Sequence, residues 1–267
     1  MRLGLGWSIF LMEIKKILSY RVEFWVGFLG SVLSQFGVAY FLWKAIFAAR
    51  GAESLQGYTF ATLMLYYLLV PLLGRVVHGQ EMGFIAGEIY DGGLSRYLIY
   101  PMSYFRVKYL ANLAYSAVFL VQMLLAMGLF LAVFRTPLQL GWPGVFKTLP
   151  VLLFAGMLYF SMISALEMVA FWADNVWSIA VLNQMVKNLL GGGLIPLAFF
   201  PHWAQAVLDY LPYSKLVSFP IRCLLGQVGT AEWLRGMGLT AAWMLAFAGL
   251  GAWIWRKGLR SYSGVGI

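Results

Sequence analysis

Cysteine, histidine and nucleotide-binding motifs are scarce or absent in this chain, and each shortage excludes a class of function. One cysteine in 267 residues rules out an intrachain disulfide framework, so Cys223 is interpreted as a small apolar residue. The two histidines, His78 and His202, are too distant in sequence to predict a metal site. No glycine-rich phosphate loop ending in Gly-Lys-Ser or Gly-Lys-Thr is present, so the chain is not expected to hydrolyse nucleotide itself.

Charge is also scarce. Charged residues make up 11% of the chain, against about 25% in a soluble domain, so they are too few to cover a water-facing surface. Hydrophobic residues make up 62%, and the mean hydropathy is +0.79. The net charge of +9 comes from bases spread between apolar runs, which favours membrane orientation over nucleic-acid binding. The ten acids are scattered, which argues against a membrane enzyme of lipid metabolism. An all-α integral membrane protein is predicted.

Six mainly apolar segments are long enough to cross a membrane as helices. A hydrocarbon core about 30 Å thick needs roughly 20 residues at about 1.5 Å per residue. Backbone groups in lipid must be paired internally, and the short alternating pattern of a membrane barrel is missing, so helices are expected. The whole chain, 1–267, is therefore interpreted as a single transmembrane domain. The predicted spans are 24–43, 58–77, 107–134, 148–172, 176–199 and 236–255.

Lysine and arginine indicate how this domain is oriented. Six crossings place both termini on one side, where the connecting segments hold eleven bases, whereas those on the opposite side hold seven. The densest clusters, such as Lys15 with Lys16 and Arg256 with Lys257, flank spans on the richer side. The positive-inside rule assigns that side to the cytoplasm. Both termini are therefore predicted to be cytoplasmic, in the plasma or inner membrane.

Two further segments are predicted to lie at the membrane surfaces. Residues 1–22 favour an amphipathic interfacial helix over a signal peptide, because Glu13 and two lysines interrupt the apolar run. Residues 196–230 are divided by four prolines into apolar pieces too short to cross, which predicts a re-entrant pair in the outer leaflet. Helices lying flat on the outer surface are the alternative. The apolar stripe of the interfacial helix consists of Trp7, Phe10, Leu11, Ile14 and Leu18.

Few ionisable side chains fall inside the predicted spans. Glu167 lies near the inner end of the fourth span, and Lys187 lies about halfway along the fifth. Lipid exposure would cost about 3 kcal/mol or more for either charge, so both are expected to face the bundle interior or a wet cavity. Asn183, Gln184 and Asn188 extend a polar stripe with Lys187. The fifth span is thus a candidate to face substrate or a second subunit, and interhelical hydrogen bonding is an equal structural alternative.

The connection between the second and third spans, 78–106, is much longer than the two to eight residues typical of a helix–helix connection. Its first part, 79–90, can continue the second span as a cytoplasmic helix with Glu81 and Glu88 exposed. Asp91-Gly92-Gly93 is then a turn or a helix stop.

A second short helix is predicted after this turn. Leu94, Leu98 and Tyr97 share one face of it, and Pro101 forces its end. A short helix held across the cytoplasmic mouth is suited to press into a groove on a partner, with Arg96 and Glu88 contributing specificity.

The ten residues from Gly92 to Pro101 carry a resemblance. They are similar to the Gly-Thr-Leu-Glu, then Leu, then Pro motif that follows the second span in permease subunits of ABC-2 type exporters. The segment from Gly193 to Pro201 resembles that family's Gly-Leu-Ile-Pro-Leu-x-Phe-Phe-Pro segment, which opens a paired re-entrant element. The interfacial helix and six spans follow the same order. Ser95 stands where many members have Glu, so a salt bridge made there is absent or comes from another acid.

This resemblance implies a permease subunit that moves a hydrophobic or amphipathic substrate outward across the cytoplasmic membrane. A coupling helix in 78–106 would dock on a separate ATPase, present in two copies, which would bind ATP and Mg²⁺, so no cofactor is expected in this chain. A second permease chain, identical or paralogous, would complete a substrate path past spans one, two and five, in contact with membrane lipid. The implied ATPase-coupling residues are Glu88, Gly92, Gly93, Leu94, Ser95, Arg96, Leu98 and Pro101.

On the residues alone, a second function stays open. A stand-alone ion-coupled secondary transporter or channel is motivated by the intramembrane charges, although no inverted repeat relates the two halves of the chain. The candidate residues for a substrate path or an intramembrane polar site are Glu167, Asn183, Lys187 and Asn188.

Overall fold

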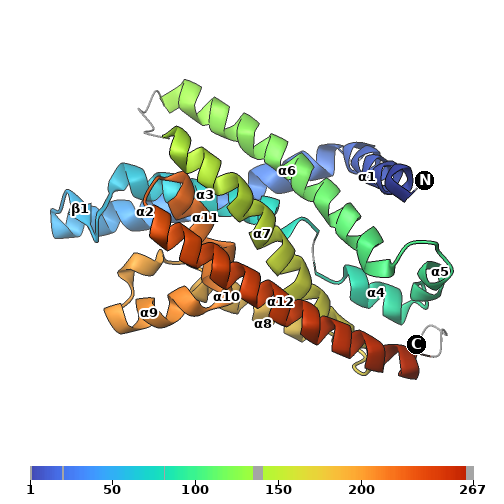
Figure 1. The fold of residues 1–267 in the computed structure, drawn as a ribbon. Helices are drawn as coiled ribbons and strands as arrows, with labels where there is room; N and C mark the ends of the chain where they lie inside the picture. The colour runs from blue at the N-terminus through green and yellow to red at the C-terminus, as the bar shows by residue number, and fades with distance from the viewer. Residues whose placement is uncertain (1, 20, 81, 135–140, 263–267) are drawn as a thin grey trace.

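The computed structural model describes residues 2–19, 21–80, 82–134 and 141–262, which form a bundle of long helices with short helices at both ends (Figure 1). Within these residues, strand occurs only in a hairpin of β1 (Ser54–Leu55) and β2 (Tyr58–Thr59). The expected all-α membrane protein is confirmed. Helices long and apolar enough to cross a membrane are α2 (Arg21–Arg50), α3 (Phe60–His78), α6 (Tyr104–Phe134), α7 (Trp142–Glu167) with the 3-10 turn η1 (Met168–Phe171), and α12 (Thr230–Ser261).

Helix α3 lies at the centre of the bundle, in contact with α2, α6, α7 and α11 (Ser218–Leu224). Its sequence is apolar on every side, which is typical of a helix enclosed by other helices. Thr59 begins the helix by accepting a hydrogen bond from the Thr62 backbone N–H at 3.3 Å. The outer helices instead expose large apolar side chains, as expected of surfaces that face lipid.

Helix α1 (Arg2–Ser19) packs against α6 at the end of the bundle that also holds both chain termini (Figure 1). Ile17 is buried, whereas Trp7, Leu11 and Leu18 of the apolar stripe are exposed. Phe10 and Ile14 of the stripe are half-buried, so only one side of it points away from the bundle, where lipid can cover it.

The predicted fifth span is not one continuous helix. Helix α8 (Trp177–Leu190) ends after 14 residues, which rise about 21 Å against a core of about 30 Å. The glycines that follow stop it, because Gly192 adopts a φ of +87°, a conformation that a side chain disfavours. The Tyr66 and Tyr67 hydroxyls donate to the carbonyls of Gly192 and Leu194 at 2.8 Å each, so this non-helical backbone is paired inside the bundle.

Segment 196–230 contains the 3-10 turn η2 (Leu197–Phe199) and three short helices, α9 (His202–Tyr210), α10 (Pro212–Leu216) and α11. Helix α11 packs between α7 and α3 with Ile221 fully buried, and α10 touches α7, α8 and α12. Helix α9 instead exposes Trp203, Val207 and Tyr210. Two of the three pieces are therefore built into the bundle rather than lying on its surface.

Candidate functional site

The short helices α4 (Phe84–Tyr90) and α5 (Leu94–Leu98) form a compact region at the end of the bundle that holds the termini (Figure 1). The chain leaves α3 at Gly79, whose φ is +61° and where an added Cβ would lie 2.4 Å from Asn112 Oδ1. The second span therefore ends at His78. The expectation that it continues into the loop as a helix is wrong. Asp91 ends α4, so the predicted helix stop at Asp91-Gly92-Gly93 is confirmed.

Glu167, the last residue of α7, holds the N-terminus of α4. Gly83 occupies the N-cap position and has no side chain to cap the helix. Oε1 of Glu167 accepts from Gly83 N–H at 2.9 Å, and Oε2 accepts from Ile85 N–H at 2.6 Å and Ala86 N–H at 3.1 Å. A carboxylate at a helix N-terminus satisfies unpaired N–H groups and complements the helix dipole. Glu167 thus has a structural role that ties α4 to the α7 end.

Glu88 makes a second attachment, from α4 to α6. Its carboxylate pairs with Nζ of Lys108 and accepts from the Tyr104 hydroxyl at 2.8 Å. Lys108 is buried, and its ammonium lies over the rings of Phe84 at 3.5 Å and Tyr97 at 4.7 Å. The exposure expected for Glu88 is wrong, since its side chain is only 15% accessible and points into the bundle. Glu88 therefore fastens the region to α6.

Tyr97 belongs to the same cluster. Burial, followed by the hydrogen bond to Glu88, raises the pKa of Tyr97 to about 12. Its hydroxyl is therefore protonated at neutral pH and is available as a donor to the carboxylate.

Helix α5 has one face inside the protein and one outside. Leu94 is completely buried with Ile85, Ile89, Met168 and Ile254, so it links α4, η1 and α12. Because it makes these internal contacts, Leu94 is not on the surface that a partner would touch.

The outer face carries different residues. Ser95, Arg96 and Pro101 are exposed, and the side chain of Leu98 lies outside the described residues. Ile99 is 84% exposed and Tyr100 is 52% exposed. Sequence reasoning missed both, although an apolar pair directly before Pro101 was a visible signal.

The polar residues of α8 form a separate group inside the bundle. Lys187 is buried, and its ammonium lies 3.4 Å from His78 Nδ1 and 5.6 Å from the ring centroid of Tyr159. Asn183 is also buried and accepts from the Tyr213 hydroxyl at 3.3 Å.

Asn188 and Glu167, the other two residues predicted for an intramembrane polar site, make contacts elsewhere. Asn188 accepts from Gln184 one turn away, at 3.4 Å. Among the described residues Glu167 and Lys187 form no ion pair, so the structure separates the two charges that motivated an ion-coupled transporter.

Fold and site define a multi-pass helical membrane protein with a short-helix region fastened to one end of its bundle. A family profile described as ABC-2 family transporter protein matches residues 33–266. The chain belongs to this family and is a membrane permease of the ABC-2 type, a membrane subunit and not the ATPase itself. The predicted family is thereby confirmed. Comparisons with curated proteins and with solved structures found no match.

Proposed function

We propose that this permease is the membrane subunit of an exporter in the cytoplasmic membrane, with both termini in the cytoplasm and the α4–α5 region docked on a separate ATPase. One observation carries the proposal: the inner face of this region is fastened to three long helices, while its outer face exposes Ile99 and Tyr100. The ATPase binds ATP and Mg²⁺, in line with the absence of a phosphate-binding loop in this sequence.

The contacts of α4 and α5 with the long helices can transmit force from a partner to the bundle. A push on α5 is passed through Leu94 to α4, and from α4 through the Glu167 cap to α7 and through Glu88 to α6. Close-packed interiors transmit displacement because they are nearly incompressible. ATP-driven movement of the partner is thus delivered to α6, α7 and α12 together.

A second permease chain completes the complex, with one ATPase for each permease. Gln35 in α2 and Gln184 in α8 are exposed on helices whose other exposed residues are mostly apolar. A polar amide that faces hydrocarbon is costly, even with the 3.4 Å hydrogen bond from Gln184 to Asn188, so contact with a second chain on these faces is favourable. The substrate is hydrophobic or amphipathic and passes outward between the chains. Among the polar residues of α8, Asn183 and Lys187 are buried inside one chain, so the half-buried Asn188 is the candidate to line this path.

Segment 177–229 supplies the fifth crossing in chain order, which brings the total to six. Helix α8 enters the bilayer from the cytoplasmic side, and α10 with α11 dips back from the outside. The burial of α11 between α7 and α3 supports this re-entrant arrangement.

The test is co-purification of the full-length chain with ATPases encoded by neighbouring genes. Ile99→Asp should abolish capture of the ATPase while the permease keeps its thermal stability, because the side chain is exposed. Ser54→Asp adds the same charge in the exposed hairpin at the opposite end and should leave capture unchanged. Capture of every ATPase unaffected by Ile99→Asp, or transport in liposomes driven by an ion gradient without ATP, would contradict the proposal.

A further inference from the structure

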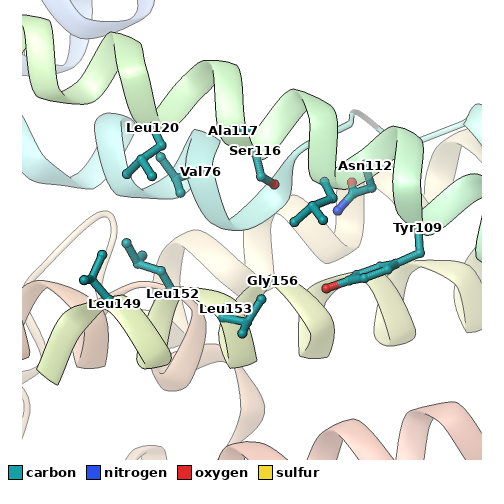
Figure 2. Close-up of a pocket in the computed structure, with 11 residues that line it drawn as sticks. Val76, Tyr109, Asn112, Ser116, Ala117, Leu120, Leu149, Leu152, Leu153 and Gly156 are labelled. Atoms are coloured by element: carbon teal, nitrogen blue, oxygen red, sulfur yellow. The ribbon is translucent and has the colours of Figure 1, made fainter. Parts of the chain in front are cut away.

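A groove of about 210 Å³ runs between α6 and α7, with α3 behind it (Figure 2). Residues of α6 from Tyr109 to Leu120 form one wall, and residues of α7 from Leu149 to Gly156 form the other. The lining is mainly aliphatic, and the small side chain of Ala117 leaves space between the helices.

The groove opens toward lipid. Leu149 and Leu153 at its rim are 52% and 46% exposed, and both walls belong to helices that are long and apolar enough to cross a membrane. Along α6, the eleven-residue step from Tyr109 to Leu120 rises about 16 Å, roughly half of the hydrocarbon core. That length matches one leaflet and therefore an acyl chain, whereas a spanning helix of a second copy needs about twice as much.

A basic residue, Arg106, lies beside one end of the groove. The ring of Tyr109 packs on Phe160 there, with centroids 5.2 Å apart. Arg106 lies one turn further along the same side of α6, is exposed, and has no carboxylate of the described residues within ion-pair distance. This end of α6 is also the end where α1, α4 and α5 lie (Figure 1). A basic residue beside an apolar groove at a membrane surface fits an anionic head group.

We infer that the α6–α7 groove is a binding site for one acyl chain of an anionic phospholipid, whose phosphate is held at Arg106. This site does not depend on ATPase coupling, and its occupant differs from bulk lipid in being held by both charge and shape.

Photolabelling of the full-length chain in phosphatidylcholine liposomes tests the site. The liposomes carry a trace of either phosphatidylglycerol or phosphatidylcholine with a diazirine in the acyl chain, and labelled peptides are mapped by mass spectrometry. Peptides covering 106–120 and 149–156 should be labelled about five-fold more by the phosphatidylglycerol probe, as about 1 kcal/mol per basic residue gives. Arg106→Gln should lower this labelling to the phosphatidylcholine level.

Two matched controls separate charge from shape. Ala117→Leu fills the groove and should reduce labelling by both probes, whereas Gly128→Leu adds an apolar group on the same helix where an added Cβ meets nothing within 4 Å and should change neither. Arg256→Gln removes another exposed arginine, near the end of α12, and should keep the phosphatidylglycerol preference. Equal labelling of all lipid-facing helices would overturn the inference. Protection of the groove from both probes, as a second copy of the chain would cause, would overturn it as well.

Discussion

Two clusters of short helices, α4–α5 and α9–α11, lie at opposite ends of the bundle and use a similar ion pair in different surroundings (Figure 1). Each has a carboxylate bound to a buried lysine, Glu88 with Lys108 in one and Asp209 with Lys215 in the other. Glu88 is 15% accessible, whereas Asp209 is 29% accessible and also binds Arg235, whose side chain is 55% accessible. Exposed pairs are screened by water and salt, and buried pairs are screened much less.

This difference indicates that the α4–α5 end is the more rigid of the two. At the α4–α5 end a second carboxylate, Glu167, is hydrogen-bonded to three backbone N–H groups, so polar contacts attach the cluster to α7 as well as to α6. At the other end Asp209 of α9 joins Lys215 of α10 and Arg235 of α12. We therefore expect substitutions of the charged residues in these contacts to cost more at the first end than at the second.

Glu167→Gln should have the largest effect. A glutamine amide has only one oxygen, so whichever way it turns, at least one of the three N–H groups of α4 faces an NH₂ donor. Leaving such donors unpaired should lower the free energy of unfolding in detergent by about 3 kcal/mol. Thermal unfolding of the purified permease measures this loss. Glu53→Gln, at an exposed site directly before β1, is the control and should change stability by less than about 0.5 kcal/mol.

Lys108→Met should come next. It removes the charged partner of a largely buried carboxylate and should cost about 2–3 kcal/mol, because Glu88 keeps only neutral hydroxyl donors, Tyr104 and Tyr97. The double variant Glu88→Gln with Lys108→Met should regain part of this loss, because no buried charge is left. A double variant as unstable as the sum of the two single ones would show that the pair itself contributes nothing.

Sequence patterns predicted the features that depend on neighbouring residues. The Asp91-Gly92-Gly93 stop, the short helix that follows it and the apolar runs all have local physical causes, and they were sufficient for the family. The glycine run that ends α8, Gly191 to Gly193, is also present in the sequence. The prediction of a fifth span over 176–199 gave more weight to the apolar residues after this run, although the backbone at Gly192 cannot continue a helix.

Contacts between distant residues could not be predicted in this way. Glu167 meets Ile85 across 82 positions, and nothing near either residue in the sequence indicates the pairing. For the same reason Glu88 was expected in solvent and Leu94 on a docking face, since an amphipathic pattern does not tell which element covers the apolar side. The sequence therefore indicates segment 78–106 as the candidate site, whereas the contacts of its individual residues follow only from the three-dimensional structure.

Asp209→Asn should have a smaller effect than either change at the α4–α5 end. Lys215 would lose its carboxylate and keep a neutral oxygen acceptor, and the partly exposed site admits water that replaces part of the interaction. A loss of about 1–2 kcal/mol is expected in thermal unfolding. A loss as large as that of Lys108→Met would remove the contrast between the two ends.

Arg235→Gln should have the smallest effect. Its guanidinium is 55% accessible and lies 3.1 Å from Asp209, which retains Lys215 as a partner at 2.7 Å. An exposed pair of this kind contributes below about 1 kcal/mol, and the contribution decreases as salt shortens the Debye length from about 10 Å at 0.1 M to about 3 Å at 1 M. The stability difference between Arg235→Gln and the unmodified chain should therefore vanish in 1 M salt, whereas the difference caused by Lys108→Met should largely persist because that pair is mostly buried. If both differences vanished together, the two clusters would be equally accessible, and the α4–α5 region would lose its distinction as the rigid end.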